Sequence, residues 1–255
     1  MAGSLPPIQV TPIGVIRSVF TDRFGIPRQP NLVTAVEARL ILLPPYDREE
    51  ALDGLDGFSH IWLVFLFHTC IGAGWRPKVR PPRLGGRRKI GVFASRAPYR
   101  PNPIGLSAVA YLGSERTTEG LTLRLRGVDL LDGTPVLDIK PYLRYADAIP
   151  TASAGFADEP PRADQPVLFT TEAQDQLLRL DPDGARQLRR LIVQTLQLDP
   201  RPGYMDRYPE RTEFAMRLAD LEIGWRQTDR AALVYRVAPA PKEPGACDDS
   251  GPIPR

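Results

Sequence analysis

Three proline-rich segments of this sequence carry side chains that recognise planar or charged ligands. The first is Pro27-Arg28-Gln29-Pro30, the second runs from Ser95 to Gly105, and the third is Asp132-Gly133-Thr134-Pro135. Because proline restricts the backbone before a ligand arrives, less conformational entropy is lost on binding. Each segment alone is also consistent with an ordinary turn. Three such segments at the ends of expected strands predict a binding site.

The second segment closes a strongly basic stretch. Residues 57–114 contain no Asp or Glu, although the whole chain has a net charge of only +3. The cations that follow residue 75 in this stretch are Arg76, Lys78, Arg80, Arg83, Arg87, Arg88, Lys89, Arg96 and Arg100. A local excess of positive charge favours polyanions as partners. The alternative is a solvated basic face, which the prolines, glycines and aromatic residues of the stretch disfavour.

Several common catalytic sites are absent from the sequence. It has no Gly-x-Gly-x-x-Gly motif after a strand, no Walker loop and no Gly-x-Ser-x-Gly motif. Neither the two cysteines nor the two histidines have the spacing of metal ligands, so no metal is expected. His60 is expected to be structural, whereas His68 suits either a site or a structural role because it ends an apolar run.

The N-terminal part of the chain shows strand patterns without intervening helices. Strands are expected at 8–20, 33–43, 61–67, 90–95, 106–112, 121–128 and 136–139. The continuous apolar run 61–67 predicts a strand buried on both faces. Since no strand–helix–strand alternation precedes Pro150, we expect a mainly β, barrel-like domain at 1–160 that is not of the Rossmann type.

The pattern changes after a linker rich in Ala, Asp and Pro at 151–166. Helices are expected at 171–180 and 185–198, and strands at 214–221, 222–227 and 232–237. The second helix has one apolar face, formed by Leu188, Leu191, Ile192, Thr195 and Leu196. We therefore expect a small α+β domain at 161–240 and a disordered tail at 241–255.

Composition places the chain among ordinary globular proteins, with 42% hydrophobic and 25% charged residues. No apolar run approaches the ~18–20 residues of a membrane span. The first residues also lack the charged and apolar regions of a secretory signal. A cytoplasmic location is therefore expected.

Longer motifs surround the three proline-rich segments. They are Phe24-Gly-Ile-Pro-Arg-Gln-Pro30, Gly57-Phe-Ser-His-Ile-Trp62, Trp75-Arg-Pro77, Val79-Arg-Pro-Pro-Arg-Leu-Gly-Gly86, Gly91-Val-Phe-Ala-Ser-Arg96, Tyr99-Arg-Pro-Asn-Pro-Ile-Gly105 and Val128-Asp-Leu-Leu-Asp-Gly-Thr-Pro-Val-Leu-Asp-Ile-Lys-Pro-Tyr142. In these motifs the chain resembles the TrmO family, also called TsaA-like, and the resemblance extends over residues 8–240.

The resemblance implies a β-barrel methyltransferase that works as a homodimer with S-adenosylmethionine as its donor. The implied acceptor is the N6 nitrogen of N6-threonylcarbamoyladenosine, beside the anticodon of transfer RNAs, notably those for threonine. The implied donor contacts are Pro27, Arg28, Gln29, His68, Thr69, Arg96, Leu106, Asp132, Gly133, Thr134 and Pro135. Thr69 stands where some members have Gln, a change that a backbone contact would tolerate.

A methyltransferase of this kind also needs an RNA contact surface and a group that assists the acceptor nitrogen. We expect phosphate contacts from Arg83, Arg87, Arg88, Lys89, Arg100 and Lys140. Asn102, held between two prolines, is expected to accept the hydrogen bond of the reacting N–H. Asp138 is the alternative, as a general base.

Two other kinds of protein remain compatible with the sequence. One is an RNA-binding module without catalysis, which the basic stretch alone would suit. The other is a nucleotide-binding regulator. Micromolar binding of S-adenosylmethionine would separate a catalyst from a bare RNA-binding module.

Overall fold

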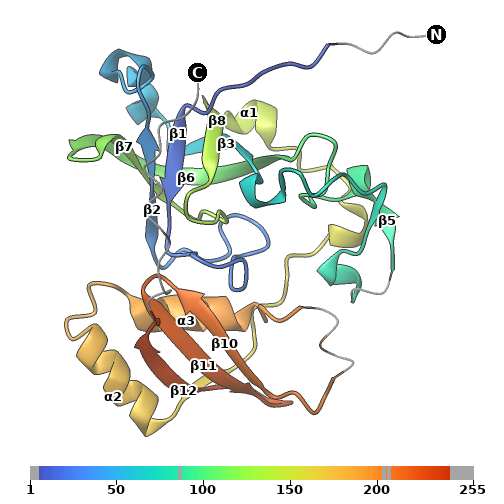
Figure 1. The fold of residues 1–255 in the computed structure, drawn as a ribbon, viewed down its shortest axis with the longest axis vertical. Helices are drawn as coiled ribbons and strands as arrows, with labels where there is room; N and C mark the ends of the chain where they lie inside the picture. The colour runs from blue at the N-terminus through green and yellow to red at the C-terminus, as the bar shows by residue number, and fades with distance from the viewer. Residues whose placement is uncertain (1–5, 86–87, 203–204, 206–207, 242–255) are drawn as a thin grey trace.

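Six strands in the N-terminal part of the chain close into a barrel. The computed structural model describes residues 6–85, 88–202, 205 and 208–241. In their order around the ring, the strands are β1 (Gly14–Arg17), β2 (Glu37–Leu42), β7 (Gly120–Arg126), β6 (Ile104–Thr117), β3 (His60–Leu66) and β8 (Pro135–Pro141). Every neighbouring pair is antiparallel, and β8 returns to pair with β1. The expected barrel-like, mainly β fold is confirmed (Figure 1).

The strand at the apolar run alternates between the barrel interior and its outer surface. Ile61, Leu63 and Phe65 point inward and are 0%, 0% and 3% exposed. Trp62 lies on the outer face, where its ring packs 5.6 Å from that of Tyr142 and its Nε1 donates a hydrogen bond to Asp147. The prediction of burial on both faces was therefore wrong, because the outward-facing side chains of this strand, at positions 62, 64 and 66, are only partly buried.

Long connections leave the barrel at the end where β3 finishes and β6 begins. Between them lies a small hairpin of β4 (Lys78–Val79) and β5 (Ile90–Gly91), which projects to one side of the molecule in Figure 1. The strand expected at 90–95 is wrong beyond Gly91, because the chain turns there into a 3₁₀ helix at Val92–Ala94. Only Val92 of this turn is buried, so its apolar residues do not line a sheet.

The remaining short helices are one-turn elements in the connections. They are the 3₁₀ helices η1 (Glu49–Leu52), η2 (Leu55–Gly57), η3 (His68–Cys70), η4 (Pro82–Leu84) and η6 (Gly155–Ala157), and the α-helix α1 (Arg144–Asp147). Within the part of the chain that is described, no helix is long and apolar enough to cross a membrane.

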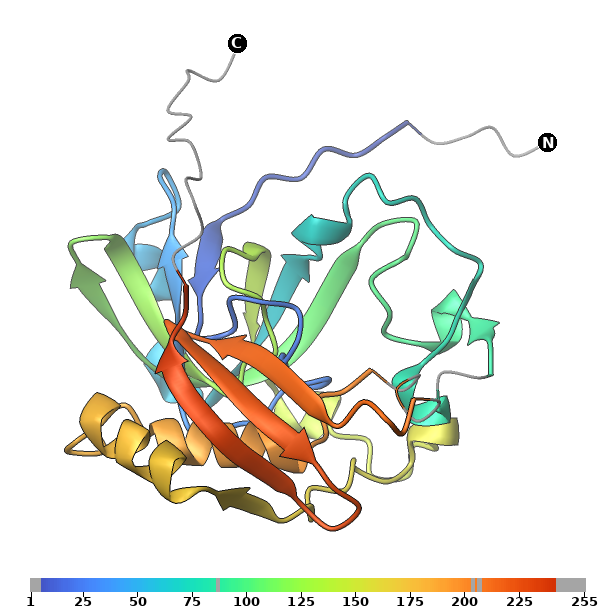
Figure 2. The same cartoon turned by 60° about the horizontal axis from the view of Figure 1, so that its bottom comes forward.

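The C-terminal part is a four-stranded sheet with two helices. Its elements are β9 (Val167–Phe169), α2 (Thr171–Leu180), α3 (Leu188–Gln197), β10 (Glu213–Leu218), β11 (Leu221–Gln227) and β12 (Ala232–Pro239). The sheet order is β10-β11-β12-β9, with β9 parallel to β12. Figure 2 shows α2 and α3 on one side of this sheet. The predicted face of the second helix is confirmed, since the same five residues are the buried ones of α3.

The core of the C-terminal part includes residues from the N-terminal end of the chain. Phe20, Val33 and Ala35 are buried in the same cluster as the residues of α3 and the sheet. The ring of Phe24 stacks on that of Trp225 at 5.9 Å. The strand expected at 33–43 consequently begins only at residue 37, because residues 33–36 belong to this second core.

The division into two domains near residue 160 stays a prediction. The disordered tail expected at 241–255 also stays a prediction, and beyond residue 241 it lies outside the described residues.

Gln194 of α3 fixes this shared segment. Its Oε1 accepts hydrogen bonds from the backbone N–H groups of Thr34 and Ala35, both at 2.9 Å. Alanine at position 194 would leave these donors without a partner, at a cost of ~1–3 kcal/mol. We expect the melting temperature of Gln194→Ala to fall by several degrees, at ~2–4 °C per kcal/mol for a chain of this size. Gln197→Ala, on the same helix, is the control. Equal melting temperatures of the two variants would contradict a stabilising role for the two Gln194 hydrogen bonds.

Candidate active site

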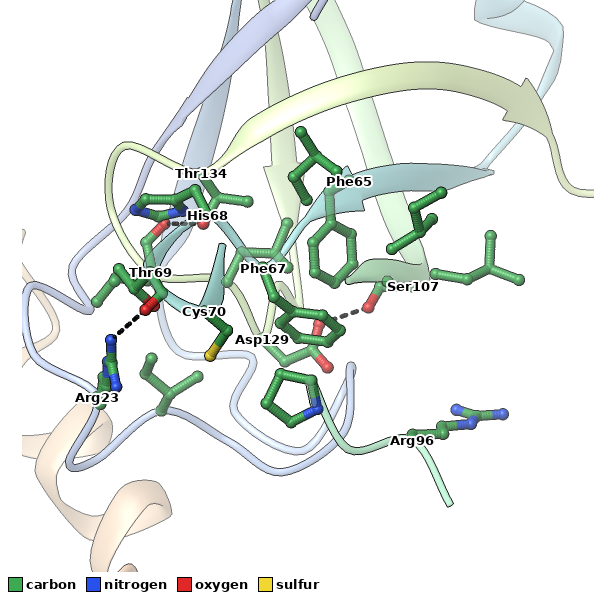
Figure 3. A pocket seen from close by; sticks show the side chains of 18 of the residues that line it. Arg23, Phe65, Phe67, His68, Thr69, Cys70, Arg96, Ser107, Asp129 and Thr134 are labelled. Atoms are coloured by element: carbon green, nitrogen blue, oxygen red, sulfur yellow. Dashed lines mark hydrogen bonds between the residues drawn. The ribbon is translucent and has the colours of Figure 1, made fainter. Parts of the chain in front are cut away.

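A cavity of about 510 Å³ opens at one end of the barrel. The end of β3, the beginning of β6 and residues 129–131 form its inner wall, while loops near residues 23–29, 67–70 and 95–100 surround it. Figure 3 shows side chains from these separate segments around one space. The volume suits a small molecule, since such pockets usually measure ~300–1,000 Å³.

Most of the residues that the sequence assigns to a small-molecule site line this cavity. They are Pro27, Arg28, Gln29, His68, Thr69, Arg96, Leu106 and Thr134. Tyr99, from the second proline-rich segment, also lines the cavity, as does Arg23, which was not expected from the sequence. All three proline-rich segments therefore contribute to one site, which the closure of the barrel assembles.

Asp132, Gly133 and Pro135 do not line the cavity, and the first two support its wall. Oδ1 of Asp132 accepts a hydrogen bond from the Ser18 N–H at 2.9 Å. The Gly133 N–H donates to the Ile16 carbonyl at 2.9 Å. These contacts hold the end of β1 against the segment that leads into β8. Direct contact of these three residues with a ligand stays a prediction.

The loop that contains Arg28 and Gln29 is held from both sides. The Arg28 guanidinium donates to the carbonyls of Asp199 and Arg201 at 3.3 and 2.9 Å. Oε1 of Gln29 accepts a hydrogen bond from Nη1 of Arg96 at 2.6 Å. Burial lowers the pKa of Arg28, and the charge of Asp199 opposes this effect. The C-terminal part and the Arg96 loop thus keep this wall in place.

His68 enters the cavity from the turn that follows β3. Arg23 fixes this turn by donating to the Thr69 carbonyl at 2.8 Å. Burial lowers the pKa of His68, a hydrogen bond with the Leu66 backbone raises it, and the charge of Arg23 lowers it. The imidazole is therefore neutral at physiological pH and offers one donor and one acceptor.

Arg100, which the sequence assigns to RNA, also lines the cavity. Its Nη1 donates to the carbonyls of Ser95 and Val92 at 2.7 and 3.1 Å. Its guanidinium carbon lies 5.6 Å from the ring centre of Phe93, on the same turn. The side chain therefore shapes the loop that carries Arg96, and contact with RNA stays a prediction.

Arg83, Arg88 and Lys89, also assigned to RNA, lie near the β4–β5 hairpin. Arg88 and Lys89 are exposed immediately before β5. Arg83 is tied to the following linker through the carbonyls of Ala157, at 3.4 Å, and Glu159. Arg87 lies outside the described residues. This leaves Arg88 and Lys89 as the assigned cations most open to a polyanion.

Neither residue expected to assist the acceptor nitrogen lines the cavity. Asn102 is exposed in the loop that precedes β6. The Asp138 side chain on β8 is 46% exposed and pairs with the Lys140 ammonium at 2.7 Å. Lys140 is thereby engaged within its own strand. The roles of Asn102, Asp138 and Lys140 stay predictions.

Asp129 and Ser107 are two further polar cavity residues that the sequence analysis did not single out. Asp129 follows β7 and lies between Val128 and Leu130, which are 5% and 2% exposed. Ser107 on β6 is 2% exposed, and its Oγ donates to Oδ1 of Asp129 at 2.7 Å. Asp129 could have been found from the sequence as an acidic residue within an otherwise apolar run at 128–131, since such a residue is rarely buried without a function or a partner.

The described residues contain no group of three or more His, Cys, Asp or Glu side chains that could hold a metal ion. His60 lies outside the cavity, with its Nδ1 2.9 Å from the Ser59 hydroxyl. The titratable side chains that line the cavity are Arg23, Arg28, His68, Cys70, Arg96, Tyr99, Arg100 and Asp129.

Comparison with families of known proteins gives two matches that together cover most of the chain. Residues 15–148 match the tRNA-methyltransferase O N-terminal domain, and residues 162–240 match the TrmO C-terminal domain. The second match ends at residue 240, one residue after the end of β12.

Individual relatives agree with these matches. The tRNA (adenine(37)-N6)-methyltransferase of Escherichia coli strain K12 is 44% identical over 231 residues, which are 91% of this chain and 98% of that protein. A relative from Pseudomonas aeruginosa, provisionally named an S-adenosylmethionine-dependent methyltransferase, is 50% identical over 220 residues, 85% of this chain and 91% of that protein. A crystal structure of TrmO from P. aeruginosa superposes with a TM-score of 0.76 at 42% identity, covering 93% of this chain and 99% of that one.

Proposed function

The chain belongs to the TrmO family, and on that premise we propose that it transfers a methyl group from S-adenosylmethionine to N6 of adenosine 37 in transfer RNA. The cavity at the end of the barrel carries this proposal. It gathers the loop at 27–29, the turn at 68–69 and Arg96 around one space, and these are donor contacts that the resemblance to the family implies.

The residues present fit S-adenosylmethionine chemically. The guanidinium groups in the cavity wall suit the donor's carboxylate. Phe65, Phe67 and Leu106 offer apolar surface for its adenine ring. When bound, the donor supplies an electrophilic methyl group, and the protein must orient it and exclude water, for which orientation alone can provide effective molarities of ~10⁵–10⁸ M.

The finer parts of the proposal concern the acceptor and the assembly. The substrate is N6-threonylcarbamoyladenosine at position 37, with threonine transfer RNA among the substrates, as the resemblance implies. The exposed cations of the β4–β5 hairpin provide the electrostatic attraction for the transfer RNA backbone. The homodimer, the cytoplasmic location and the two-domain division are further parts of this proposal.

Neutralising exposed cations of the hairpin should weaken transfer RNA binding and flatten its salt dependence. In Lys78→Ala/Arg88→Ala/Lys89→Ala, the log–log slope of affinity against salt should decrease by about one unit for each lost phosphate contact. Binding of S-adenosylmethionine should not change, because these side chains do not line the cavity.

The control for this prediction removes the same charge from the C-terminal part of the molecule. Arg179, Arg190 and Arg230 are exposed there, and their triple alanine variant should keep the wild-type slope. If the hairpin variant and the control have the same slope, the RNA contacts lie elsewhere.

A label-transfer assay tests the proposed function itself. Transfer RNA from cells that lack this protein is incubated with the wild-type chain and S-adenosylmethionine that carries a labelled methyl group. We expect label in the RNA and an equal amount of S-adenosylhomocysteine. Tight binding of both partners without any transfer would instead support a protein that binds RNA without catalysis.

A further inference from the structure

Among the described residues that line the cavity, Asp129 is the only acidic one. The other titratable or charged groups around the same space are Arg23, Arg28, His68, Cys70, Arg96, Tyr99 and Arg100. Asp129 lies in the connection from β7 to β8, between the buried side chains of Val128 and Leu130. Both neighbours belong to the buried core of the barrel, which gives the carboxylate a defined position relative to a bound ligand.

A buried hydroxyl orients this carboxylate. Ser107 Oγ donates to Oδ1 of Asp129 at 2.7 Å, and Figure 3 shows the pair within the group of side chains that line the cavity. This bond holds Oδ1 in place, and the Asp129 backbone makes a further hydrogen bond to the carboxylate. Since a carboxylate has about four lone-pair sites, these contacts orient it and leave it able to accept a proton in a defined direction.

Methylation of an N6 nitrogen needs such an acceptor. The nitrogen lone pair is conjugated with the purine ring and, in the threonylcarbamoyl form, with the ureido carbonyl. As the N–C bond forms, positive charge develops on the nitrogen unless its proton leaves. A positioned base that takes this proton typically contributes ~10²–10⁴-fold to the rate.

We propose that the Asp129 carboxylate takes the proton of the acceptor nitrogen during methyl transfer and that Ser107 is its positioning residue. This inference rests on the proposed function. The new bond joins the acceptor nitrogen to the methyl carbon, and the bond from that carbon to the donor sulfur breaks. The electron pair of that bond remains on sulfur, which becomes a neutral thioether, and the proton passes from nitrogen to Asp129.

The electrostatic setting of Asp129 is compatible with this role. Burial raises the pKa of its carboxyl to about 6, and the Ser107 hydrogen bond and the charge of Arg96 oppose this rise. A base with such a pKa is ionised at neutral pH and still basic enough to accept a proton. Because only the ionised form can act, activity should be present above this pKa and be lost as the pH falls through it.

The kinetic effect of Asp129→Asn tests the proposal. Asparagine keeps the shape and can still accept the Ser107 hydrogen bond, so the fold should persist. We expect turnover to fall by ~10²–10⁴-fold, while the affinity for S-adenosylmethionine and the melting temperature change little. The pH dependence of kcat/KM reports the pKa values of groups in the free enzyme. In the wild type, kcat/KM should fall at low pH as Asp129 becomes protonated, and this fall, the acid limb of the profile, should be absent from the variant. Asp229→Asn, an exposed carboxylate in the turn between β11 and β12, is the matched control.

The Ser107→Ala variant separates positioning from simple packing. Since the Ser107 hydrogen bond lowers the pKa of Asp129, its loss should move the acid limb of kcat/KM to higher pH as well as reducing turnover. Ser114→Ala makes the same change at an exposed position of the same strand and should leave the profile in place. If Ser107 has a purely structural role, Ser107→Ala should lower the melting temperature and leave the acid limb of the kcat/KM profile at its wild-type pH.

The competing assignments give different results in the same assay. If Asp129→Asn keeps wild-type turnover and its acid limb while Asn102→Ala or Asp138→Asn loses activity, the proposal is overturned. A large loss of donor affinity with unchanged turnover at saturating donor would also overturn it, because Asp129 would then only bind the cation. If the wild-type chain transfers no methyl group to RNA, the proposed function fails instead, so the two failures are distinguishable.

Discussion

Replacing Arg96 by alanine should weaken the binding of S-adenosylmethionine by about 10- to 150-fold, which corresponds to the ~1.5–3 kcal/mol of a charge-assisted hydrogen bond. Arg96 lines the cavity, and its Nη1 also donates to Oε1 of Gln29 at 2.6 Å. The substitution therefore removes a cation from the site and releases the loop at 27–29. Both effects act on the same ligand, whereas the core of the barrel is untouched.

Calorimetric titration with the donor measures this effect directly. Arg96→Lys should recover only part of the affinity, because an ammonium keeps the charge but cannot make the paired contacts of a guanidinium. Arg179→Ala, an exposed arginine on α2, should bind like the wild type. Wild-type affinity in Arg96→Ala, with an unchanged melting curve, would remove Arg96 from the donor site.

A methyl group at position 105 should damage both the cavity and the barrel. A Cβ atom at Gly105 would overlap the Cζ and Cε2 atoms of Phe65 and lie 2.8 Å from Cε1. Phe65 is 3% exposed inside the barrel and also lines the cavity, so its ring cannot move without disturbing both. Overpacking of this kind costs ~1–3 kcal/mol. We expect Gly105→Ala to melt at a lower temperature and to bind the donor much more weakly.

A second substitution tests whether this clash is the cause. Phe65→Leu removes the ring atoms that the new methyl group would meet, so the double variant should regain part of the lost stability and affinity. The two substitutions should therefore be strongly non-additive. If Gly105→Ala behaves like the wild type, or if Phe65→Leu worsens it additively, the close approach seen in the structure does not limit the site.

The fold could be predicted where a local pattern decides the outcome. The α3 helix is an example, because the spacing of its apolar residues selects one face whatever lies opposite. Residues 33–36 show the limit of this reasoning. Their alternation indicates burial, but it does not tell which core they join, and they pack with α3 instead of extending β2. The run at 61–67 was misjudged for a related reason, since apolar composition does not distinguish a half-covered barrel face from a fully buried one.

The site shows the same division between local and long-range information. Arg28, Gln29 and Arg96 could be identified from their motifs, and the structure brings them into contact. Asp129 could not be selected, because its importance depends on Ser107 and on a cavity formed by segments distant in the sequence. Asn102 had the more distinctive local sequence, yet it lies outside the cavity wall. Proline-rich context marks a rigid backbone but does not say which side chain faces the ligand.

Mass spectrometry of transfer RNA nucleosides tests the central claim most directly. Transfer RNA that carries N6-threonylcarbamoyladenosine is incubated with the wild-type chain and S-adenosylmethionine, then digested to nucleosides, alongside the same RNA without that modification. The account predicts that the threonylcarbamoylated nucleoside is converted to a form one methyl group heavier, with the methyl on N6, and that Arg96→Ala does so far more slowly at limiting donor. An unchanged nucleoside profile, or methylation at another base or atom, would contradict it.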